Sequence, residues 1–417
     1  MITTINNKHK KLNAPNLRFP EFEGEWEKCK LEDYGKVVTG NTPPTKDIEN
    51  YENGTYLWAS PADLGTIKSI TETKTMLSAQ GFSKTRTLPK GSVLVTCIGS
   101  TIGKAGMATK EMSTNQQINS IVVNDNNDNE FVYYAIQSAF PRYLSSIAVQ
   151  AVPIISKSAF ELLPNNRPYL QEQKKIGKFL SLLDERIATQ SKIIEDLKKL
   201  KSAIIEKVFC SPNQEHPMCR IAGFEQALST YKMSDFSSRI ATKNKDSKCS
   251  LVLTIAAQYG LVNQESFFNK SVASENLSGY YLLHKGEFAY NRSYSAGYDW
   301  GAVKRLDNYD EGVLSTLYIC FKINETIVDS DYLAYYFEST KWHRGLSDIA
   351  GEGARNHGLL NVSITDYFNT KHRFPVIEEQ KAIAKMLNTI TEKEKKATLL
   401  EECYQKQKLY LLRQMFI

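Results

Sequence analysis

The chain has 417 residues, enough for two or three domains, and its 41% hydrophobic and 24% charged content is ordinary for a soluble globular protein. No apolar run approaches the roughly 18 residues that a membrane-spanning helix needs, and residues 1–16 lack the apolar centre of a signal peptide, so we expect a cytoplasmic protein without a membrane segment. The net charge is +6, but residues 1–167 carry 18 basic and 16 acidic side chains and residues 210–374 carry 17 and 18. A domain that binds nucleic acid only through phosphates is normally more basic than these near-neutral segments, so charge alone leaves DNA binding open.

The first part of the chain, residues 1–167, predicts an α+β domain. Residues 1–16 are expected to be a flexible leader, and Leu17–Trp26 is rich in turn residues and aromatic anchors. Short β-like runs and one helix follow, and Pro164 and Pro168 close the domain. The expected strands are 36–38, 56–59, 93–98 and 118–123, and the expected helix is 131–140.

The next segment, residues 168–209, predicts one long helix. From Leu170 to Phe209 it contains no Pro, and its apolar residues repeat every seven positions, as in a coiled-coil seam. Gln190 and Lys201 are the polar interruptions of the two seam lines. The first line is Ile176, Leu183, Leu197 and Ile204, and the second is Leu180, Ile187, Ile194 and Val208.

The rest of the chain repeats this plan. Residues 210–374 predict a second α+β domain, in which Lys285-Gly286 matches Lys90-Gly91 and 332–339 matches 131–138. Residues 375–417 follow 168–209 at a constant offset of 207 without a gap, and both copies have Glu-Gln in the first helical turn. We therefore predict two pseudo-repeated domains, each followed by a long helix, with the two helices packed as an antiparallel coiled coil. The second seam is thinner because Ala397 and Tyr404 stand where the first has larger or more apolar residues.

Three motifs that could carry chemistry fail in detail. In Gly99–Ala105 the first Gly is one residue too close for a phosphate loop, and Ala105 replaces the Ser or Thr that would hold Mg²⁺. Asn41–Thr45 resembles the Asn-Pro-Pro-aromatic motif of amino-methyltransferases, but Thr42 interrupts it and no aromatic residue follows. The seven Cys form no Cys-x-x-Cys pair and the six His no His-Glu-x-x-His motif, so no metal site is predicted.

Polar and aromatic loops remain as the candidate binding residues. Asn, Gln and Arg can make paired hydrogen bonds to base edges, whereas Lys, Ser and Thr can hold phosphates. Ordinary solvated loops are the competing interpretation for any single residue. The candidates are Asn41, Thr42, Lys84, Arg86, Ser100, Thr101, Lys104, Gln116, Gln117, Lys243, Lys245, Arg292, Tyr294, Tyr298, Trp300, Arg355 and Asn356.

Four features together resemble the specificity subunits of type I restriction–modification enzymes. They are the Leu-Arg-Phe-Pro-Glu-Phe start at Leu17, the two Pro-x-x-x-Glu-Gln-Lys helix starts at Pro168 and Pro375, the segment Gly312–Tyr318 and the duplicated plan. The resemblance covers essentially the whole chain. The helix starts are its most specific marks.

The resemblance implies a target recognition function divided between the two domains. Each domain would read one half of a bipartite target in double-stranded DNA, and the helices would set the spacer between the halves. Two methyltransferase subunits, which use S-adenosylmethionine, and restriction subunits, which use ATP and Mg²⁺, would assemble on this chain. The chain itself would bind no cofactor or metal and catalyse nothing. A coiled-coil adaptor that binds proteins is the alternative, and a fused methyltransferase is the third possibility.

Overall fold

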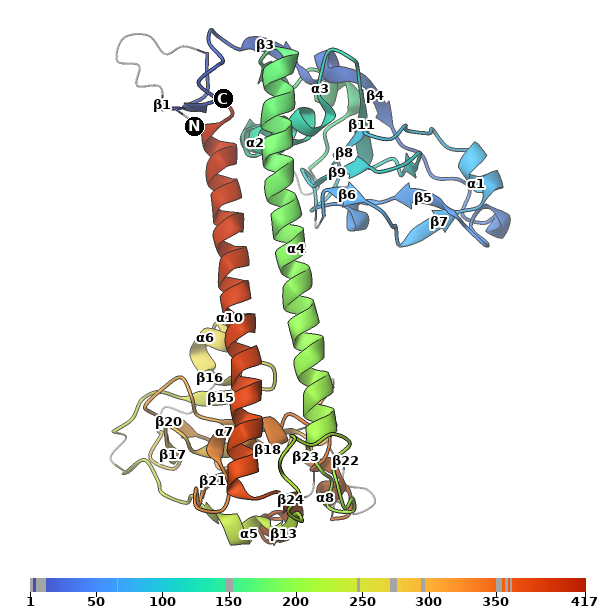
Figure 1. Cartoon of the computed structure of the whole chain (residues 1–417). Helices are drawn as coiled ribbons and strands as arrows, with labels where there is room; N and C mark the ends of the chain where they lie inside the picture. Colours follow the sequence, from blue (N-terminus) through green and yellow to red (C-terminus); the bar gives the residue numbers. More distant parts are fainter. Residues whose placement is uncertain are drawn as a thin grey trace. The chain divides into compact units, whose positions relative to one another are not determined.

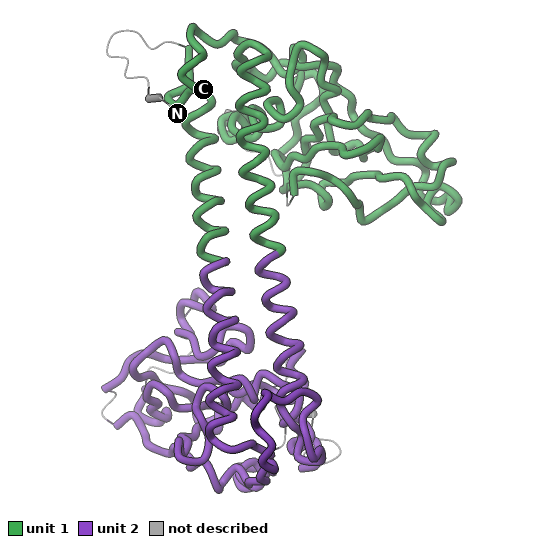
Figure 2. The backbone as a smooth tube through the Cα atoms, viewed as in Figure 1, with its two compact units in different colours: residues 1–192, 398–417 green, residues 193–397 purple. Residues whose placement is uncertain are grey.

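The computed structural model describes residues 3–4, 13–65, 67–146, 153–245, 248–270, 276–293, 297–349, 355–356, 359–360 and 362–417. The chain forms two compact units, one of residues 1–192 and 398–417 and the other of residues 193–397 (Figure 2). Each unit contains one mixed α/β domain and part of each long helix. The division between the units passes through both long helices.

The predicted long helices are present as α4 (Leu170–Val208) and α10 (Ile377–Gln414) (Figure 1). In unit 1 the start of α4 packs against the end of α10, and one core contains Leu180, Leu183 and Leu411. In unit 2 the end of α4 packs against the start of α10, where Ile205 and Leu387 share a core. The two helices therefore run antiparallel in each unit, as predicted.

Both polar interruptions of the first seam are largely removed from solvent. Lys201 Nζ lies 3.3 Å from Glu394 Oε2 of α10, and both side chains are less than one-fifth exposed. Gln190 is 8% exposed. Polar residues inside a seam commonly fix the register of the two helices.

The first domain is built on a sheet with the strand order β4-β11-β8-β9-β6. A smaller sheet, β10-β5-β7, and the pair β12-β3 complete it, and helix α2 covers the larger sheet (Figure 1). The strands of unit 1 are β1 (Thr3–Thr4), β2 (Leu17–Arg18), β3 (Glu27–Lys30), β4 (Gly35–Thr39), β5 (Tyr56–Ala59), β6 (Ser69–Ile70), β7 (Thr75–Leu77), β8 (Val93–Thr96), β9 (Ala105–Ala108), β10 (Ser113–Thr114), β11 (Ile118–Val123) and β12 (Pro164–Arg167). Its shorter helices are α1 (Ala79–Ser83), α2 (Asn129–Ser146) and α3 (Lys157–Glu161), with 3₁₀ turns at Leu31–Tyr34, Ile48–Asn50 and Pro61–Asp63.

The second domain repeats the central strand order as β14-β21-β18-β19. The pair β13-β24 corresponds to β3-β12, and β15-β16, β17-β20 and β22-β23 are further pairs. The strands are β13 (Ser229–Lys232), β14 (Ser237–Arg239), β15 (Leu253–Ala256), β16 (Gly260–Asn263), β17 (Tyr281–His284), β18 (Phe288–Asn291), β19 (Ala302–Arg305), β20 (Glu311–Leu314), β21 (Ile319–Ile323), β22 (Arg355–Asn356), β23 (Leu359–Leu360) and β24 (Lys371–Phe374). The shorter helices are α5 (Met233–Phe236), α6 (Gln264–Phe268), α7 (Ser330–Tyr336), α8 (His343–Ser347) and α9 (Ile364–Asn369).

Parts of the predicted leader make defined contacts. Thr3–Thr4 pairs with Leu17–Arg18 as an antiparallel strand. Asn13 Nδ2 donates to the Trp26 carbonyl oxygen at 2.6 Å and to Asn166 Oδ1 at 2.9 Å. The described ends of this segment are thus attached to the first domain, and its remaining residues lie outside the described ranges.

In each unit an arginine–glutamate ion pair joins the domain to the start of the long helix that follows it in the sequence. Arg18 Nη2 lies 2.8 Å from Glu172 Oε2 in unit 1, and Arg220 Nη2 lies 2.7 Å from Glu379 Oε2 in unit 2. Both glutamates are almost fully buried, so the guanidinium partner offsets the cost of burying their charge. This ion pair explains why a glutamate occurs at the same position in both helix starts.

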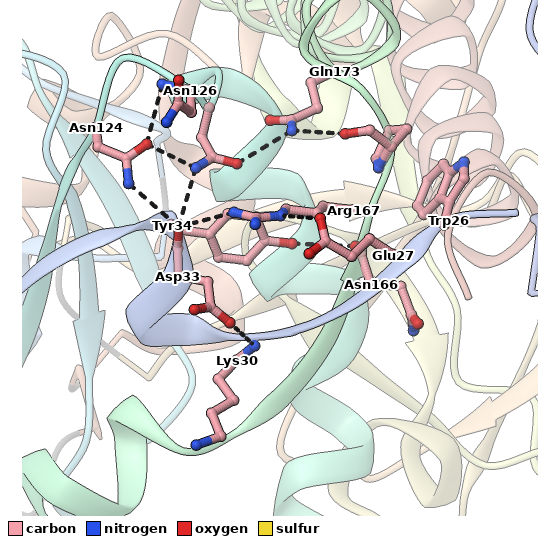
Figure 3. Close-up of polar contacts among 12 residues, drawn as sticks. Trp26, Glu27, Lys30, Asp33, Tyr34, Asn124, Asn126, Asn166, Arg167 and Gln173 are labelled. Carbon is pink, nitrogen blue, oxygen red and sulfur yellow. Dashed lines mark hydrogen bonds and ion pairs between the residues drawn. The ribbon is translucent and has the colours of Figure 1, made fainter.

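The glutamine that follows each glutamate is hydrogen-bonded to the start of a helix in the domain, α2 in unit 1 and α7 in unit 2. Gln173 Oε1 accepts from the Asp128 backbone N–H at 3.0 Å, and Gln380 Oε1 accepts from that of Asp329 at 2.9 Å. Figure 3 shows Gln173 reaching the first domain beside the Arg167–Glu27 ion pair. The Glu-Gln pair at the start of each long helix is therefore required by the structure, because both side chains bond the helix to another part of the domain.

Candidate nucleic-acid interface

The shared strand order identifies equivalent positions in the two domains. Val93 pairs with Ile121 in unit 1, and Phe288 pairs with Phe321 in unit 2. On the other side of these strands, Ile121 also pairs with Val37 of β4, and Phe321 also pairs with Arg239 of β14. The loops that follow β4 and β14 are therefore equivalent, so Asn41 corresponds to Lys243.

In the first domain Asn41 joins two of the predicted loops. Its Nδ2 donates to the Lys84 carbonyl oxygen and its Oδ1 accepts from the Arg86 backbone N–H, both at 2.9 Å. Arg86 Nη1 donates to the Thr39 carbonyl oxygen at 2.8 Å, while the side chain remains exposed. The structure thus brings Asn41, Lys84 and Arg86 together.

Three further predicted residues, Thr42, Gln116 and Gln117, follow these loops in the first domain. The Thr42 hydroxyl donates to Gln116 Oε1 at 2.5 Å. Gln117 Oε1 accepts from Asn115 Nδ2 at 3.0 Å, and its carbonyl oxygen accepts from the Cys97 backbone N–H. The side-chain amides here are partly engaged with one another, which fixes the loop that carries them.

The segment Gly99–Lys104 is a turn between β8 and β9, not a phosphate loop. Gly103 has φ 91°, and a Cβ there would lie 2.5 Å from Phe140 Cδ1, so the turn requires glycine. Ser100 and Lys104 are exposed and Thr101 is half-buried. The turn presents these side chains next to Gln117, since Cys97 at the end of β8 is bonded to it.

In the second domain Lys243 is held over an aromatic ring. Its Nζ lies 4.0 Å from the centroid of Tyr281 and donates to the Gly279 carbonyl oxygen at 2.7 Å. Arg239 Nη2 donates to the Tyr281 hydroxyl at 3.0 Å. Lys243 and Tyr281 also form an isolated β-bridge. They occupy the positions equivalent to Asn41 and Arg86, which are hydrogen-bonded in the first domain.

Arg239 and Tyr281 are absent from the residues predicted from the sequence. The repeated Lys-Gly pair could have identified Tyr281. Tyr281 lies four residues before Lys285, just as Arg86 lies four residues before Lys90. No comparable local signal marks Arg239, whose contact depends on how β14 and β17 meet in space.

The other predicted residues of the second domain differ in how available they are. Arg292 donates from Nε and Nη2 to the Leu317 carbonyl oxygen and from Nη1 to that of Val362, so its guanidinium supports two backbone segments. Tyr298 and Trp300 are half-buried against hydrophobic cores, whereas Lys245 is exposed. Arg355 and Asn356 form β22. Tyr294 and the side chains of Arg355 and Asn356 lie outside the described residues.

Within the described residues, no group of three or more His, Cys, Asp or Glu side chains is placed to hold a metal ion. Burial raises the pKa of the Cys97 and Cys320 thiols to about 12 and that of Cys29 to about 11, so these thiols are protonated at neutral pH. They are not nucleophiles under those conditions. Nor does any helix in the described part of the chain combine the length and apolar character needed to cross a membrane.

Comparison with known proteins agrees with this arrangement. Residues 23–199 match the family model described as the type I restriction modification DNA specificity domain. In this part the chain is similar to type I restriction enzyme specificity subunits. It is 29% identical over 191 residues to the MjaIX specificity subunit of Methanocaldococcus jannaschii, covering 44% of this chain and 44% of that protein. It is 34% identical over 126 residues to the HindI specificity subunit of Haemophilus influenzae, covering 30% and 27%. The chain thus spans less than half the length of these curated relatives.

Solved structures extend the likeness to the fold of almost the whole chain. The crystal structure of the type I restriction–modification S subunit from M. genitalium matches with a TM-score of 0.57 at 16% identity, covering 97% of this chain and 99% of that one. A structure from work on complex assembly and conformational transition of the type I R-M system matches with a TM-score of 0.53 at 14% identity, covering 93% and 96%. The predicted α+β fold with two repeated domains and two long helices is therefore confirmed.

Proposed function

We propose that this chain is the DNA sequence-recognition subunit of a type I restriction–modification complex and reads a bipartite target with its two domains. The observation that carries the proposal is the duplicated framework with different side chains at equivalent positions. Asn41 and Arg86 meet in the first domain, whereas Lys243 and Tyr281 meet in the second. One scaffold bearing two side-chain sets suits the reading of two different half-sites.

The long helices offer surfaces for methyltransferase subunits. In unit 2 Ile193 and Leu200 of α4 are exposed, and their spacing of seven residues places them on one side of the helix. On α10 Leu399 and Tyr410 are exposed and are also eleven residues apart. Apolar side chains aligned along one side of a helix suit a protein-binding surface. We propose two methyltransferase subunits, and restriction subunits joined to them, as the partners of this chain in the cytoplasm.

In this proposal the chain is not an enzyme. S-adenosylmethionine would bind the methyltransferase subunits, and ATP and Mg²⁺ the restriction subunits. No residue of this chain is assigned to any of these cofactors. The chain contributes base contacts and a frame, and the adenine chemistry belongs to the partners.

The test is adenine methylation mapping in a host that carries this chain together with its methyltransferase subunits. We expect one bipartite sequence with a fixed spacer to be methylated. Exchanging residues 17–167 for the first domain of another family member should change one half of that sequence and leave the other half unchanged. The purified chain alone with labelled S-adenosylmethionine should transfer no label.

A complex that methylates without a bipartite sequence would contradict the recognition function. A chain that binds the methyltransferase subunits without directing them to any sequence would instead support the coiled-coil adaptor. Alteration of both half-sites by the one-domain exchange would show that the domains do not read independently.

A further inference from the structure

In unit 1 a single tyrosine joins the first domain to both long helices. The hydroxyl of Tyr134, on α2, donates to Asp184 Oδ2 of α4 at 2.5 Å. Asp184 Oδ1 lies 2.6 Å from Lys408 Nζ of α10. Tyr134 therefore reaches α10 through one carboxylate.

Tyr134 is also contacted by Lys68, which lies at the edge of the five-stranded sheet of the first domain. Lys68, just before β6, donates from Nζ to Glu130 Oε2 at 2.6 Å, to Ser181 Oγ at 2.7 Å and to the Tyr134 hydroxyl at 3.5 Å. The ammonium groups of Lys68 and Lys408 both lie 5.6 Å from the Tyr134 ring centroid. We call Lys68, Glu130, Tyr134, Asp184 and Lys408 the first hub.

The charges of the first hub are largely removed from solvent. The side chains of Lys68, Asp184 and Lys408 are 11%, 16% and 20% exposed. Burial and the neighbouring Asp184 carboxylate raise the pKa of Tyr134, so its hydroxyl keeps the proton that it donates. Partly buried charges of this kind are stable only in the geometry that pairs them.

Unit 2 contains a second hub at the repeated positions, with other residues. The Tyr335 hydroxyl lies 2.8 Å from Asn388 Oδ1 and 2.9 Å from Thr391 Oγ1 of α10. Asn388 and Thr391 follow Ser181 and Asp184 by the repeat offset of 207. Arg305 Nη1, from the sheet, lies 2.8 Å from Asp331 Oδ1, which replaces the Lys68–Glu130 pair.

Apolar packing alone does not fix how a domain is turned on a helix, because the hydrophobic effect is not directional. Hydrogen bonds are directional, and their strength falls steeply away from a straight geometry. The Tyr134 hydroxyl is bonded to Asp184 of α4 and to Lys68 beside β6, and Asp184 is paired with Lys408 of α10. This network therefore limits rotation of the first domain on the helix pair. Since successive base pairs are about 3.4 Å apart, a small rotation suffices to shift a reading loop by one base pair.

Resting on the proposed function, we propose that the first hub is a positioning device that determines which spacer length between the half-sites the complex accepts. Its residues would touch no base. They act through the orientation of the first domain, and they are distinct from the loop residues that read the half-site sequence.

The test uses the full chain in complex with its methyltransferase subunits and the variant Tyr134→Phe, which removes the hydroxyl and keeps the ring. The matched control is Tyr133→Phe. Tyr133 is the adjacent, equally buried tyrosine, and its hydroxyl is bonded to Gln137 of the same helix. Binding is measured on duplexes that carry the methylated target with the original spacer or with one base pair added or removed.

For Tyr134→Phe we expect discrimination against the altered spacers to fall roughly tenfold, the equivalent of one hydrogen bond to a charged group. Half-site sequences in methylation maps should stay unchanged, and Tyr133→Phe should keep the original spacer preference. An active Tyr134→Phe complex with unchanged discrimination would overturn the inference. So would loss of methylation at every spacing, because the hub would then serve folding alone. A wild-type complex that recognises no bipartite target would overturn the proposed function itself.

Discussion

The rings of Phe131 and Phe416 pack with their centroids 5.5 Å apart, which places the end of the chain in the core of the first domain. Phe416 is 8% exposed. The repeat supplies Phe209 at the corresponding position, where it packs against Tyr332 with centroids 5.0 Å apart. Each domain is thus completed by the end of the helix that belongs to the other copy in the sequence.

The first prediction is that Phe416→Ala destabilises unit 1. Loss of a buried aromatic side chain leaves a cavity and should lower the free energy of unfolding by about 3–5 kcal/mol. Urea denaturation with hydrogen exchange of the first domain measures it. Tyr410→Ala is the control, because that aromatic side chain is 58% exposed and should cost little. Equal effects of both substitutions would show that Phe416 does not complete the core.

The second prediction concerns the close approach of α2 to α4. A Cβ on Gly177 would lie 2.5 Å from Asp128 Oδ1 and 2.9 Å from the Phe131 backbone nitrogen. Gly177→Ala should therefore destabilise the protein by about 1–3 kcal/mol, despite a helix propensity gain of about 1 kcal/mol. The repeat has Ala384 at this position, so Ala384→Gly is the reciprocal variant and should cost only the propensity difference. A stabilised Gly177→Ala protein in thermal unfolding would contradict the packing.

Sequence reasoning succeeded where structure depends on local periodicity. The seven-residue period predicted α4, and the expected strands 36–38, 56–59 and 118–123 lie within β4, β5 and β11. It could not show what Lys201 contacts, because Glu394 is 193 positions away and faces it only through the register of two helices. Nor could it show that Arg292 is bonded to backbone carbonyl groups. Residue type indicates what a side chain can bind, whereas its availability depends on tertiary neighbours.

The third prediction is a pH dependence that arises from His372. Its Nδ1 lies 3.1 Å from the Tyr336 hydroxyl and its Nε2 2.9 Å from Thr370 Oγ1, and complete burial lowers its pKa to about 3. An unfolded histidine has a pKa near 6.5, so below about pH 6.5 the unfolded chain binds a proton that the folded chain does not. The resulting stability is fully present above that pH and falls as the pH drops toward 3.

The measurement compares wild type with His372→Gln by urea unfolding at about pH 7 and about pH 5. Wild type should lose about 1–2 kcal/mol more than the variant over this interval, because the slope approaches 1.4 kcal/mol per pH unit for one proton. Other titrating groups cancel in the difference between the two proteins. Identical pH slopes would show that His372 is accessible to protons in the folded state.

The fourth prediction separates base reading from phosphate binding in the first domain. Arg86→Ala should cost about 1–3 kcal/mol in binding and relax one position of one half-site if the exposed guanidinium contacts a guanine edge. Lys104→Ala should weaken binding to all sequences alike if its ammonium binds a phosphate. The assembled complex is titrated with target and single-base variants, and exposed Lys90, outside the Asn41 group, serves as the control. We expect less from Arg292, since its guanidinium is already bonded. No change for Arg86 and Lys104 would remove both loops from the interface.

The last prediction treats the long helices as a ruler. In unit 2 Lys201 pairs with Glu394, and Ile194 and Ala397 are both buried. A cut after Leu197 in α4 and after Glu394 in α10 leaves the Lys201–Glu394 pair on one side and the two buried apolar residues on the other. Seven residues inserted at both places preserve the heptad positions on each side. The insertion adds about 10 Å of helix, equivalent to roughly three base pairs at ~3.4 Å each. The domains must also follow the groove as it winds, which reduces the attainable change.

We therefore expect the double heptad variant to methylate the same two half-sites with a longer spacer. Insertion of two residues at both places is the control, because it turns the apolar line out of the seam and should lower solubility or abolish methylation. Methylation mapping in a host carrying the complete set of subunits reads both outcomes. A heptad variant that stays folded and active while methylating the original spacing would show that α4 and α10 pack the domains without measuring the distance between half-sites.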